Sequence, residues 1–269
     1  MHFTKMHGLG NDYLYVYGEV PKNIEELARK LSERHFGAGS DGMIYISPSN
    51  IADFKMRIFN ADGSEAKMCG NGIRCVGKYV YDKGYTDKSH LRIETLSGIK
   101  DLDLQFSGGK VKFVTVNMGT AIPEKDKTLT VCGKKINGVP VSMGNPHFVI
   151  FIKDNENLLE LAKTYGPEIE LGAEFPEKTN VEFIKIHSPK EIELCVWERG
   201  CGITLACGTG ACASVVAGIL NGLLENSVEV ELLGGKVNVV WNGTPNKPNG
   251  DVFLSGPAEY VFASEINLK

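Results

Sequence analysis

Residues 53–75, DFKMRIFNADGSEAKMCGNGIRC, and residues 191–213, EIELCVWERGCGITLACGTGACA, carry the same pattern twice. In each copy an alternating apolar run, typical of a half-buried strand, leads into a polar loop and a Cys-Gly-x-Gly turn. A segment compatible with a helix follows each turn. At an offset of 138 residues Cys69 aligns with Cys207 and Asn60 aligns with Glu198. The pattern therefore places two cysteines in equivalent settings, one in each half of the chain.

The repeat extends beyond the cysteine turns. The segment 10–16, GNDYLYV, aligns with 144–150, GNPHFVI, at an offset of 134, and Ser40-Asp41 aligns with Thr179-Asn180 at an offset of 139. Any one of these segments alone could be generic strand and turn sequence. Three of them in the same order at a nearly constant offset indicate two copies of one fold.

The expected elements favour sheets built around helices. The strands and helices do not alternate regularly, so the pattern argues against a doubly wound parallel sheet. We predict an α/β chain of the α+β type with two pseudo-symmetric domains, each a mixed, mostly antiparallel sheet wrapped around a central helix. The segment TGACASVVAGILNGLL is apolar on all sides and predicts a buried helix. The other predicted helices cover 23–37, which opens with a capping-box-like start, 70–83 and 155–165, the last closed by Gly166-Pro167. The predicted strands cover 2–7, 13–17, 43–46, 53–59, 90–96, 99–106, 110–117, 129–132, 147–152, 181–186, 191–197, 228–233, 236–241 and 251–255.

The predicted domain boundaries follow from the repeat. The first domain covers residues 1–118, the second covers 119–257, and the C-terminal segment 258–269 returns to the first domain. The segment 123–127, Pro-Glu-Lys-Asp-Lys, has the composition of a linker.

Composition limits the classes of function. With 269 residues, 42% hydrophobic residues and a net charge of −4, the chain has the profile of a globular protein without a nucleic-acid surface. The sequence contains no apolar run of the roughly 18 residues that a membrane helix needs, and its start lacks a signal-peptide core. Seven cysteines, an odd number in a long chain, favour reduced thiols over a secreted disulfide framework. We therefore expect a cytoplasmic protein.

The two aligned cysteines are the candidate reactive groups. Each precedes a predicted helix start, where unpaired N–H groups and the helix dipole lower the pKa of a thiol from about 8.5 toward neutrality. One thiolate removing a proton from one face of a carbon, and one thiol returning a proton to the other face, would invert a stereocentre. The N–H groups of both helix starts would stabilise the negative charge that develops on an adjacent carboxylate. This chemistry requires no cofactor.

Other readings of the cysteines remain open. A buried thiol usually serves packing, and we assign that role to Cys132 and Cys195 and, more cautiously, to Cys75, Cys201 and Cys212. Five residues separate Cys69 from Cys75 and Cys201 from Cys207, and four separate Cys207 from Cys212, which does not match the CxxC pairs of structural zinc. A single nucleophilic cysteine with a histidine partner would leave the second copy unexplained.

The segments GNDY, FNADGSEAKMCGNGIRC, MGNPH, TNVEF and ERG…ACGTGACAS together resemble the diaminopimelate epimerase family along nearly the whole chain. The resemblance implies two pseudo-symmetric domains with the active site in the cleft between them, no cofactor and no metal. It implies interconversion of LL- and meso-2,6-diaminopimelate, on the bacterial and plant route to lysine and peptidoglycan precursors. It also implies a homodimer, while the composition of the chain indicates no nucleic-acid or membrane partner.

The resemblance also assigns roles to residues of this chain. Cys69 and Cys207 would be the two acid/base thiols, and His147 an auxiliary group. The residues that would bind substrate are Asn11, Asn60, Gly70, Asn71, Asn145, Asn180, Glu198, Arg199, Gly208 and Thr209. For several of these a structural role is the alternative: a turn for Asn11, Asn60 and Asn145, a surface ion pair for Glu198-Arg199, and a structural hydrogen bond for His147.

Two positions depart from the family pattern. Ile203 stands where the usual motif has Glu, and position 42 in the early loop is Gly42. Neither replaces an acid/base residue. The alternative functions are a related cofactor-independent racemase for proline or hydroxyproline, and a thiol- or metal-dependent binding module. The sequence leaves open which thiol is ionised at rest, whether the domains are open or closed, and which surface forms the dimer.

Overall fold

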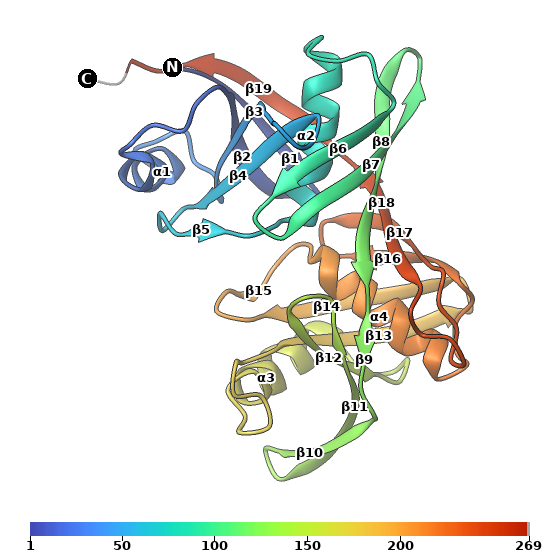
Figure 1. Ribbon diagram of the computed structural model, residues 1–269. Helices are drawn as coiled ribbons and strands as arrows, with labels where there is room; N and C mark the ends of the chain where they lie inside the picture. The colour runs from blue at the N-terminus through green and yellow to red at the C-terminus, as the bar shows by residue number, and fades with distance from the viewer. Residues whose placement is uncertain (268–269) are drawn as a thin grey trace. The chain divides into compact units, whose positions relative to one another are not determined.

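The computed structural model describes residues 1–267. The chain divides into two units: Met1–Val116 with the segment from Gly256 onward forms unit 1, and Asn117–Ser255 forms unit 2 (Figure 1). Both boundaries fall inside strands, β8 (Lys110–Thr120) and β18 (Asp251–Pro257), so the chain passes between units without a separate linker. The linker predicted at 123–127 is wrong, because its ends belong to strands β9 (Ile122–Pro123) and β10 (Lys127–Val131).

The sheet of unit 1 is mixed and mostly antiparallel. Its strands pair in the order β19–β1–β2–β3–β4–β6–β7–β8, and only the pairs β2–β3 and β4–β6 are parallel. The short strand β5 adds to β4. The strands not yet given are β1 (His2–Gly8), β2 (Asn11–Tyr17), β3 (Gly42–Pro48), β4 (Phe54–Asn60), β5 (Glu65–Ala66), β6 (His90–Thr95), β7 (Gly98–Ser107) and β19 (Glu259–Glu265).

Unit 2 repeats this order strand for strand. Its strands pair as β9–β11–β12–β13–β14–β16–β17–β18, the pairs β12–β13 and β14–β16 are parallel, and the short β15 adds to β14. The hairpin strand β10 has no counterpart in the described part of unit 1. The predicted fold class, two repeated α+β halves, is therefore confirmed. The remaining strands are β11 (Lys134–Ser142), β12 (Pro146–Phe151), β13 (Asn180–Ser188), β14 (Glu191–Glu198), β15 (Gly202–Ile203), β16 (Ser227–Leu232) and β17 (Gly235–Trp241).

One helix lies at the centre of each unit. Helix α2 (Gly70–Asp82) contacts β1, β2 and β7, and α4 (Gly208–Leu220) contacts β11 to β14 and β17. Every residue of α4 from Gly210 to Ile219 is buried, as its all-round apolar sequence predicts. Within residues 1–267 no helix has both the length and the hydropathy of a membrane span.

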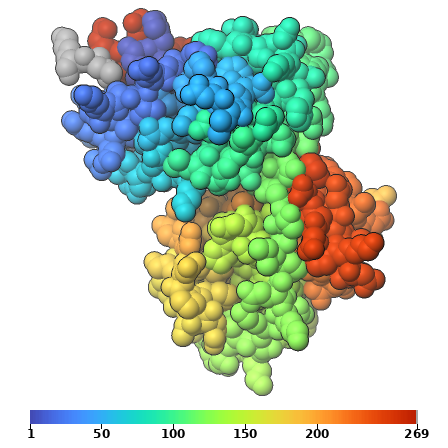
Figure 2. Space-filling view, viewed as in Figure 1, coloured from blue at the N-terminus to red at the C-terminus, as the bar shows by residue number. Residues whose placement is uncertain are grey.

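The other helix of each unit packs on the outer face of its sheet. Helix α1 (Ile24–Ser32) packs on β3 and β4 and lies on the surface in Figure 2, and α3 (Leu158–Glu170) packs on β13 and β14. The apolar residues between each outer helix and its sheet form a separate core cluster in each unit.

The ends of both outer helices differ from the predicted ends. Helix α1 stops at Ser32 instead of near Gly37, and Asn23 stands at its N-cap without a side-chain capping bond. Helix α3 begins after Asn157, whose side chain caps the Glu160 N–H, and it continues through Pro167. A Cβ at Gly166 would lie 2.5 Å from Trp197, so close packing on the sheet holds the helix where local sequence favours a stop.

Strand β11 was not predicted because it contains two residues that disfavour strands, Gly138 and Pro140. The glycine has a packing reason: a Cβ there would lie 2.5 Å from the ring of Phe148. The tertiary environment therefore outweighs the local signals in this strand.

Candidate active site

The two aligned cysteines occupy the same position at the start of the two central helices. Cys69 is the N-cap of α2, and its Sγ accepts a hydrogen bond from the Gly72 N–H at 3.3 Å. Cys207 is the N-cap of α4, and its Sγ accepts from the Gly210 N–H at 3.3 Å. The sulfur thus replaces the oxygen of an ordinary capping side chain at the positive end of each helix.

The glycine three residues after each cysteine allows the sheet to approach the helix start. A Cβ at Gly72 would lie 2.7 Å from the Ile44 side chain. A Cβ at Gly210 would lie 2.8 Å from Oε1 of Glu182. The two glycines are therefore equivalent, but the side chains that they admit differ: one is apolar and the other is a carboxylate.

The environment of Cys69 brings together several of the predicted residues. Its Sγ donates to Asn11 Oδ1 at 3.3 Å, and Asn71 Nδ2 donates to the same oxygen at 3.4 Å. The fully buried Arg74 fixes Asn71 by donating to its Oδ1 at 2.9 Å, and it also donates to the Gly70 carbonyl at 3.2 Å. Sequence reasoning did not identify Arg74.

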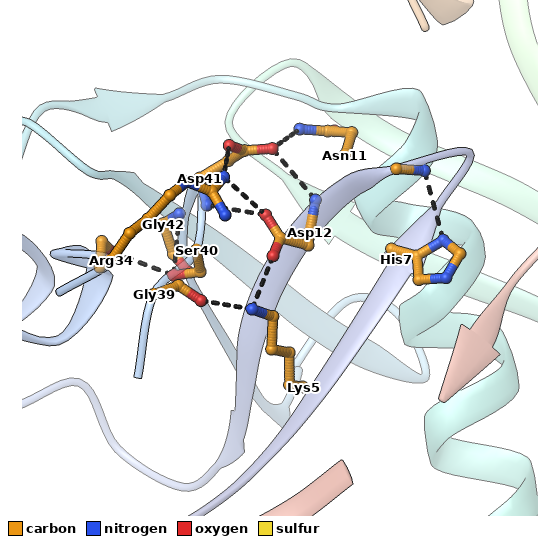
Figure 3. A network of polar contacts seen from close by, with 11 residues as sticks. Lys5, His7, Asn11, Asp12, Arg34, Gly39, Ser40, Asp41 and Gly42 are labelled. Carbon is orange, nitrogen blue, oxygen red and sulfur yellow. Dashed lines mark hydrogen bonds and ion pairs between the residues drawn. The ribbon is translucent and has the colours of Figure 1, made fainter. Parts of the chain in front are cut away.

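A polar network behind the site orients Asn11 (Figure 3). Asn11 Nδ2 donates to Asp41 Oδ2 at 2.8 Å. Because a carboxylate only accepts, the amide nitrogen faces Asp41 and the amide oxygen faces Cys69. Arg34 Nη2 lies 2.9 Å from Asp41, and Lys5 Nζ lies 2.8 Å from Asp12. These cations balance the two aspartates, so the orientation of Asn11 depends on charges outside the predicted site.

Asn60 has the turn contacts that were considered for it. Its Nδ2 donates to Ser64 Oγ at 3.0 Å, and its carbonyl accepts from the Gly63 N–H at 2.9 Å. In the described structure the Asn60 side chain therefore stabilises the turn after β4.

A chain of polar contacts leads to Cys207 in unit 2. Thr209 Oγ1 lies 3.5 Å from Cys207 Sγ, and Asn145 Nδ2 donates to Thr209 Oγ1 at 3.4 Å. His147 Nε2 lies 3.2 Å from Asn145 Oδ1, and His147 Nδ1 lies 2.7 Å from Glu182 Oε1. The structure therefore links four predicted residues in one row and adds Glu182 at its end.

Burial and nearby charges shift the pKa of Cys207 in the direction opposite to the one expected from its helix start. Burial raises the pKa of Cys207 well above the ordinary value, and the charges of Glu198 and Glu182 raise it further. Hydrogen bonds from Thr209 and from the Gly210 N–H lower the pKa, but these effects are smaller. The prediction of a lowered pKa at Cys207 is therefore wrong, because desolvation exceeds the effect of the helix start.

Burial also shifts the pKa of Glu198. Its pKa is raised, mainly by desolvation, while a hydrogen bond from Thr204 lowers it. The exposed Arg199 donates instead to the Glu177 carbonyl at 2.9 Å. In the described structure Glu198 thus accepts from Thr204 and Arg199 donates to Glu177, and the surface ion pair considered for them is not formed.

Asn180 holds the backbone near these residues. Its Nδ2 donates to the Pro146 carbonyl at 2.9 Å, and its Oδ1 accepts from the Arg199 N–H at 3.0 Å. Both polar ends of the side chain therefore tie neighbouring segments together.

The strand register corrects one part of the sequence alignment. Leu14 pairs with Met43, and the equivalent Phe148 pairs with Val181. The offset across β3 and β13 is therefore 138 and not 139, which makes Gly42 the counterpart of Asn180.

The corrected register identifies an asymmetry between the halves. His147 and Glu182, both buried, occupy the positions of Tyr13 and Ile44 in unit 1. The signal that could have identified Glu182 is a charged residue between the apolar Val181 and Phe183 of the predicted strand.

The departures from the family pattern have simple packing roles. Ile203, in β15, pairs with Trp197 of β14 and packs against the core of unit 2. A Cβ at Gly42 would lie 2.2 Å from the Phe59 carbonyl oxygen, so only glycine fits there.

The remaining cysteines divide into two groups. Cys75, Cys195 and Cys212 are buried, which confirms a packing role for them. Cys132 is exposed, so its predicted packing role is wrong: it lies in the β10–β11 turn and donates to Glu168 at 2.9 Å. Cys201 is exposed as well. Residues 1–267 contain no group of three or more His, Cys, Asp or Glu side chains arranged to hold a metal ion.

Comparisons with known proteins identify the relatives of this chain. The family model for diaminopimelate epimerase matches residues 3–123 and 139–261. A diaminopimelate epimerase from Acetivibrio thermocellus is 49% identical, covering 100% of this chain and 99% of the relative. One from Methanococcus maripaludis (strain C6) is 48% identical, covering 100% of both chains.

Solved structures share the fold at low sequence identity. A phenazine biosynthesis protein of the PhzF family from Bacillus anthracis has a TM-score of 0.74 at 17% identity, covering 100% of this chain and 99% of that one. A hydroxyproline epimerase from Agrobacterium vitis has a TM-score of 0.74 at 16% identity, covering 99% and 90%. These likenesses concern the fold alone.

Proposed function

The chain belongs to the diaminopimelate epimerase family, and from this premise we propose that it interconverts LL- and meso-2,6-diaminopimelate without a cofactor. The observation that carries the proposal is the pair of N-cap cysteines at equivalent helix starts. Its place would be the synthesis of lysine and peptidoglycan precursors, in the cytoplasm.

The proposed chemistry uses the two thiols as acid and base. One cysteine, as thiolate, removes the α-proton from one face of the substrate carbon, and the S–H of the other protonates the opposite face. The carbon has then inverted, and the two cysteines have exchanged protonation states. The N–H groups at Gly70, Asn71, Gly208 and Thr209 would bind the reacting carboxylate, where negative charge develops in the transition state.

The other family positions would recognise the rest of the substrate. Arg199, whose guanidinium is exposed, would pair with the distal carboxylate. Asn11, Asn60, Asn145, Asn180 and Glu198 would contact the amino and carboxylate groups, and His147 would act as an auxiliary group. A substrate with a second amino-acid head uses this set better than proline does.

The decisive experiment is incubation with LL-diaminopimelate in heavy water. We expect meso product that carries deuterium at one α-carbon, because the donated proton comes from a thiol that exchanges with solvent. NMR and mass spectrometry measure its position and amount.

Parallel incubations separate the alternatives. Deuterium incorporation into proline or hydroxyproline, without reaction of diaminopimelate, would instead support a racemase of the same fold. Tight zinc binding with no exchange into any amino acid would support a binding module and contradict the proposal.

We also propose that the chain forms a homodimer. All seven residues of β19 are exposed, and among them Val261 and Phe262 are 50% and 43% exposed. An exposed strand with apolar side chains is a surface that a second copy can cover.

A charge on this strand should separate the copies. For the wild type we expect twice the chain mass of 29.3 kDa in light scattering, and for Val261→Lys the single mass. Ile51→Lys, at another exposed apolar position, is the control and should stay dimeric. A wild type of single mass would contradict the homodimer, and a dimeric Val261→Lys would exclude β19 as its surface.

A further inference from the structure

The turn between β14 and β15 carries two of the residues that would bind substrate, Glu198 and Arg199. The pair Glu198 and Gly202 closes this hairpin, and Gly200 within the turn has a φ of 77°. Because Arg199 is exposed, few side-chain contacts restrict it. The place where its guanidinium meets a ligand therefore depends on what holds the backbone of the turn.

Two side chains from other elements hold successive N–H groups of the turn. Asn180 Oδ1 accepts from the Arg199 N–H at 3.0 Å. Glu170 Oε1 accepts from the Gly200 N–H at 2.9 Å. Asn180 belongs to the set of residues that the family resemblance assigns to the substrate, whereas Glu170 does not. One of the two groups that fix the turn thus lies outside the residues assigned so far.

The core of unit 2 holds Glu170 itself in place. Glu170 is the last residue of α3 and only 7% exposed, and its Oε2 accepts from the Trp197 indole N–H at 2.8 Å. Gly166 lies one turn earlier on the same face of α3 and admits the Trp197 ring, since a Cβ there would lie 2.5 Å from it. Both oxygens of Glu170 therefore accept from N–H groups, and the carboxylate joins the packed helix to the backbone of the turn.

Unit 1 holds the equivalent turn in the same place with different chemistry. At the offset of 138 residues that aligns Asn60 with Glu198, Asp62 is the counterpart of Gly200. Arg29, on the outer helix α1, donates from Nε to the Asp62 carbonyl at 2.7 Å. In each unit a charged side chain of the outer helix thus bonds the same backbone position of the turn. This recurrence indicates that holding the turn is a feature of the fold.

We propose that Glu170 is a positioning residue for substrate recognition: it fixes the turn that presents Arg199 to the distal carboxylate of the substrate. The inference rests on the proposed function, because Arg199 has this role only if the substrate carries a second carboxylate, as diaminopimelate does. Glu170 acts through the Gly200 N–H. With the turn fixed before binding, the substrate does not have to order it, and affinity is preserved.

The first test measures the turn itself and needs no activity. Hydrogen exchange with mass spectrometry follows the amides of residues 198–202, and NMR follows the two indole N–H groups, of Trp197 and Trp241. In Glu170→Ala we expect the Gly200 amide to exchange about tenfold faster, the worth of one hydrogen bond to a charged group, and only the Trp197 indole resonance to shift. Glu168→Ala, at an exposed position of the same helix, is the matched control and should change neither.

The second test measures the consequence for the substrate. In Glu170→Ala we expect the KM for diaminopimelate to rise about tenfold with a much smaller change in kcat, because the two cysteines stay in place. When Arg199 is already Met, Glu170→Ala should not lower kcat/KM further, since the turn then presents no guanidinium. An additive double variant, or a loss in kcat with KM unchanged, would overturn the proposal.

The two tests separate this inference from the proposed function. Unchanged exchange of the turn in Glu170→Ala overturns the inference whether or not the chain acts on diaminopimelate. Faster exchange in a protein whose wild type does not turn over diaminopimelate would overturn the proposed function and the role of Arg199, but the hold of Glu170 on the turn would stand. If Glu170→Ala does not fold by circular dichroism, Glu170→Gln takes its place. It keeps the size but only one accepting atom, so exchange and KM should rise in the same direction.

Discussion

Cys69→Ser and Cys207→Ser are each expected to lower epimerisation at least about a hundredfold, the usual contribution of a positioned acid or base. A serine hydroxyl is a far weaker acid than a thiol, so it neither removes the α-proton nor supplies one at neutral pH. Because each sulfur caps a helix through a single N–H at 3.3 Å, serine can retain that contact and the fold should survive. Initial rates in both directions measure the loss.

Cys132→Ser is the matched control, since this exposed thiol lies in the β10–β11 turn. Its rate should equal that of the wild type, and circular dichroism should be unchanged in all three variants. Near wild-type turnover in either Cys69→Ser or Cys207→Ser would rule out the two-thiol mechanism.

Arg74→Met is expected to lower the free energy of unfolding by about 3 kcal/mol. The Arg74 guanidinium is fully buried and donates to the Gly70 carbonyl, the Asn71 side chain and the Pro257 carbonyl. Methionine fills most of the volume but leaves these acceptors without that donor. Asn71 would also lose the contact that orients it toward Asn11, so we expect the rate of epimerisation to fall as well.

Urea denaturation of the two variants compares a fully buried arginine with a partly exposed one. Arg57 forms an ion pair with Glu65 on the surface, so Arg57→Met should change the free energy of unfolding by less than about 1 kcal/mol. Equal losses in Arg57→Met and Arg74→Met would contradict a special role for the buried guanidinium.

The sequence was informative where local chemistry and tertiary packing agree. The start of α2 follows from Cys69 and the glycines after it, and the burial of α4 follows from its all-round apolar sequence. Local signals failed where packing opposes them. Pro167 suggested the end of a helix, but α3 continues because Gly166 packs tightly on Trp197.

In the site, too, the sequence predicted what local motifs encode and missed what depends on tertiary packing. The cysteines were found because their motif repeats, and the repeat directly encodes a helix start. Asp41 and Glu182 act through side chains distant in sequence, so only the strand register reveals them. The raised pKa of Cys207 depends on burial and on two carboxylates from other strands, which no local motif contains.

The pairing of β1 with β19 has a consequence for the order in which the protein folds during synthesis. His2 pairs with Glu265, and Lys5 pairs with Phe262, so the first strand waits for a partner translated after the whole of unit 2. Closing so long a loop is costly in chain entropy, and such contacts form late. Unit 2, whose residues are continuous in the chain, can complete its sheet on the ribosome, whereas unit 1 leaves one edge of β1 open to other chains until translation reaches β19.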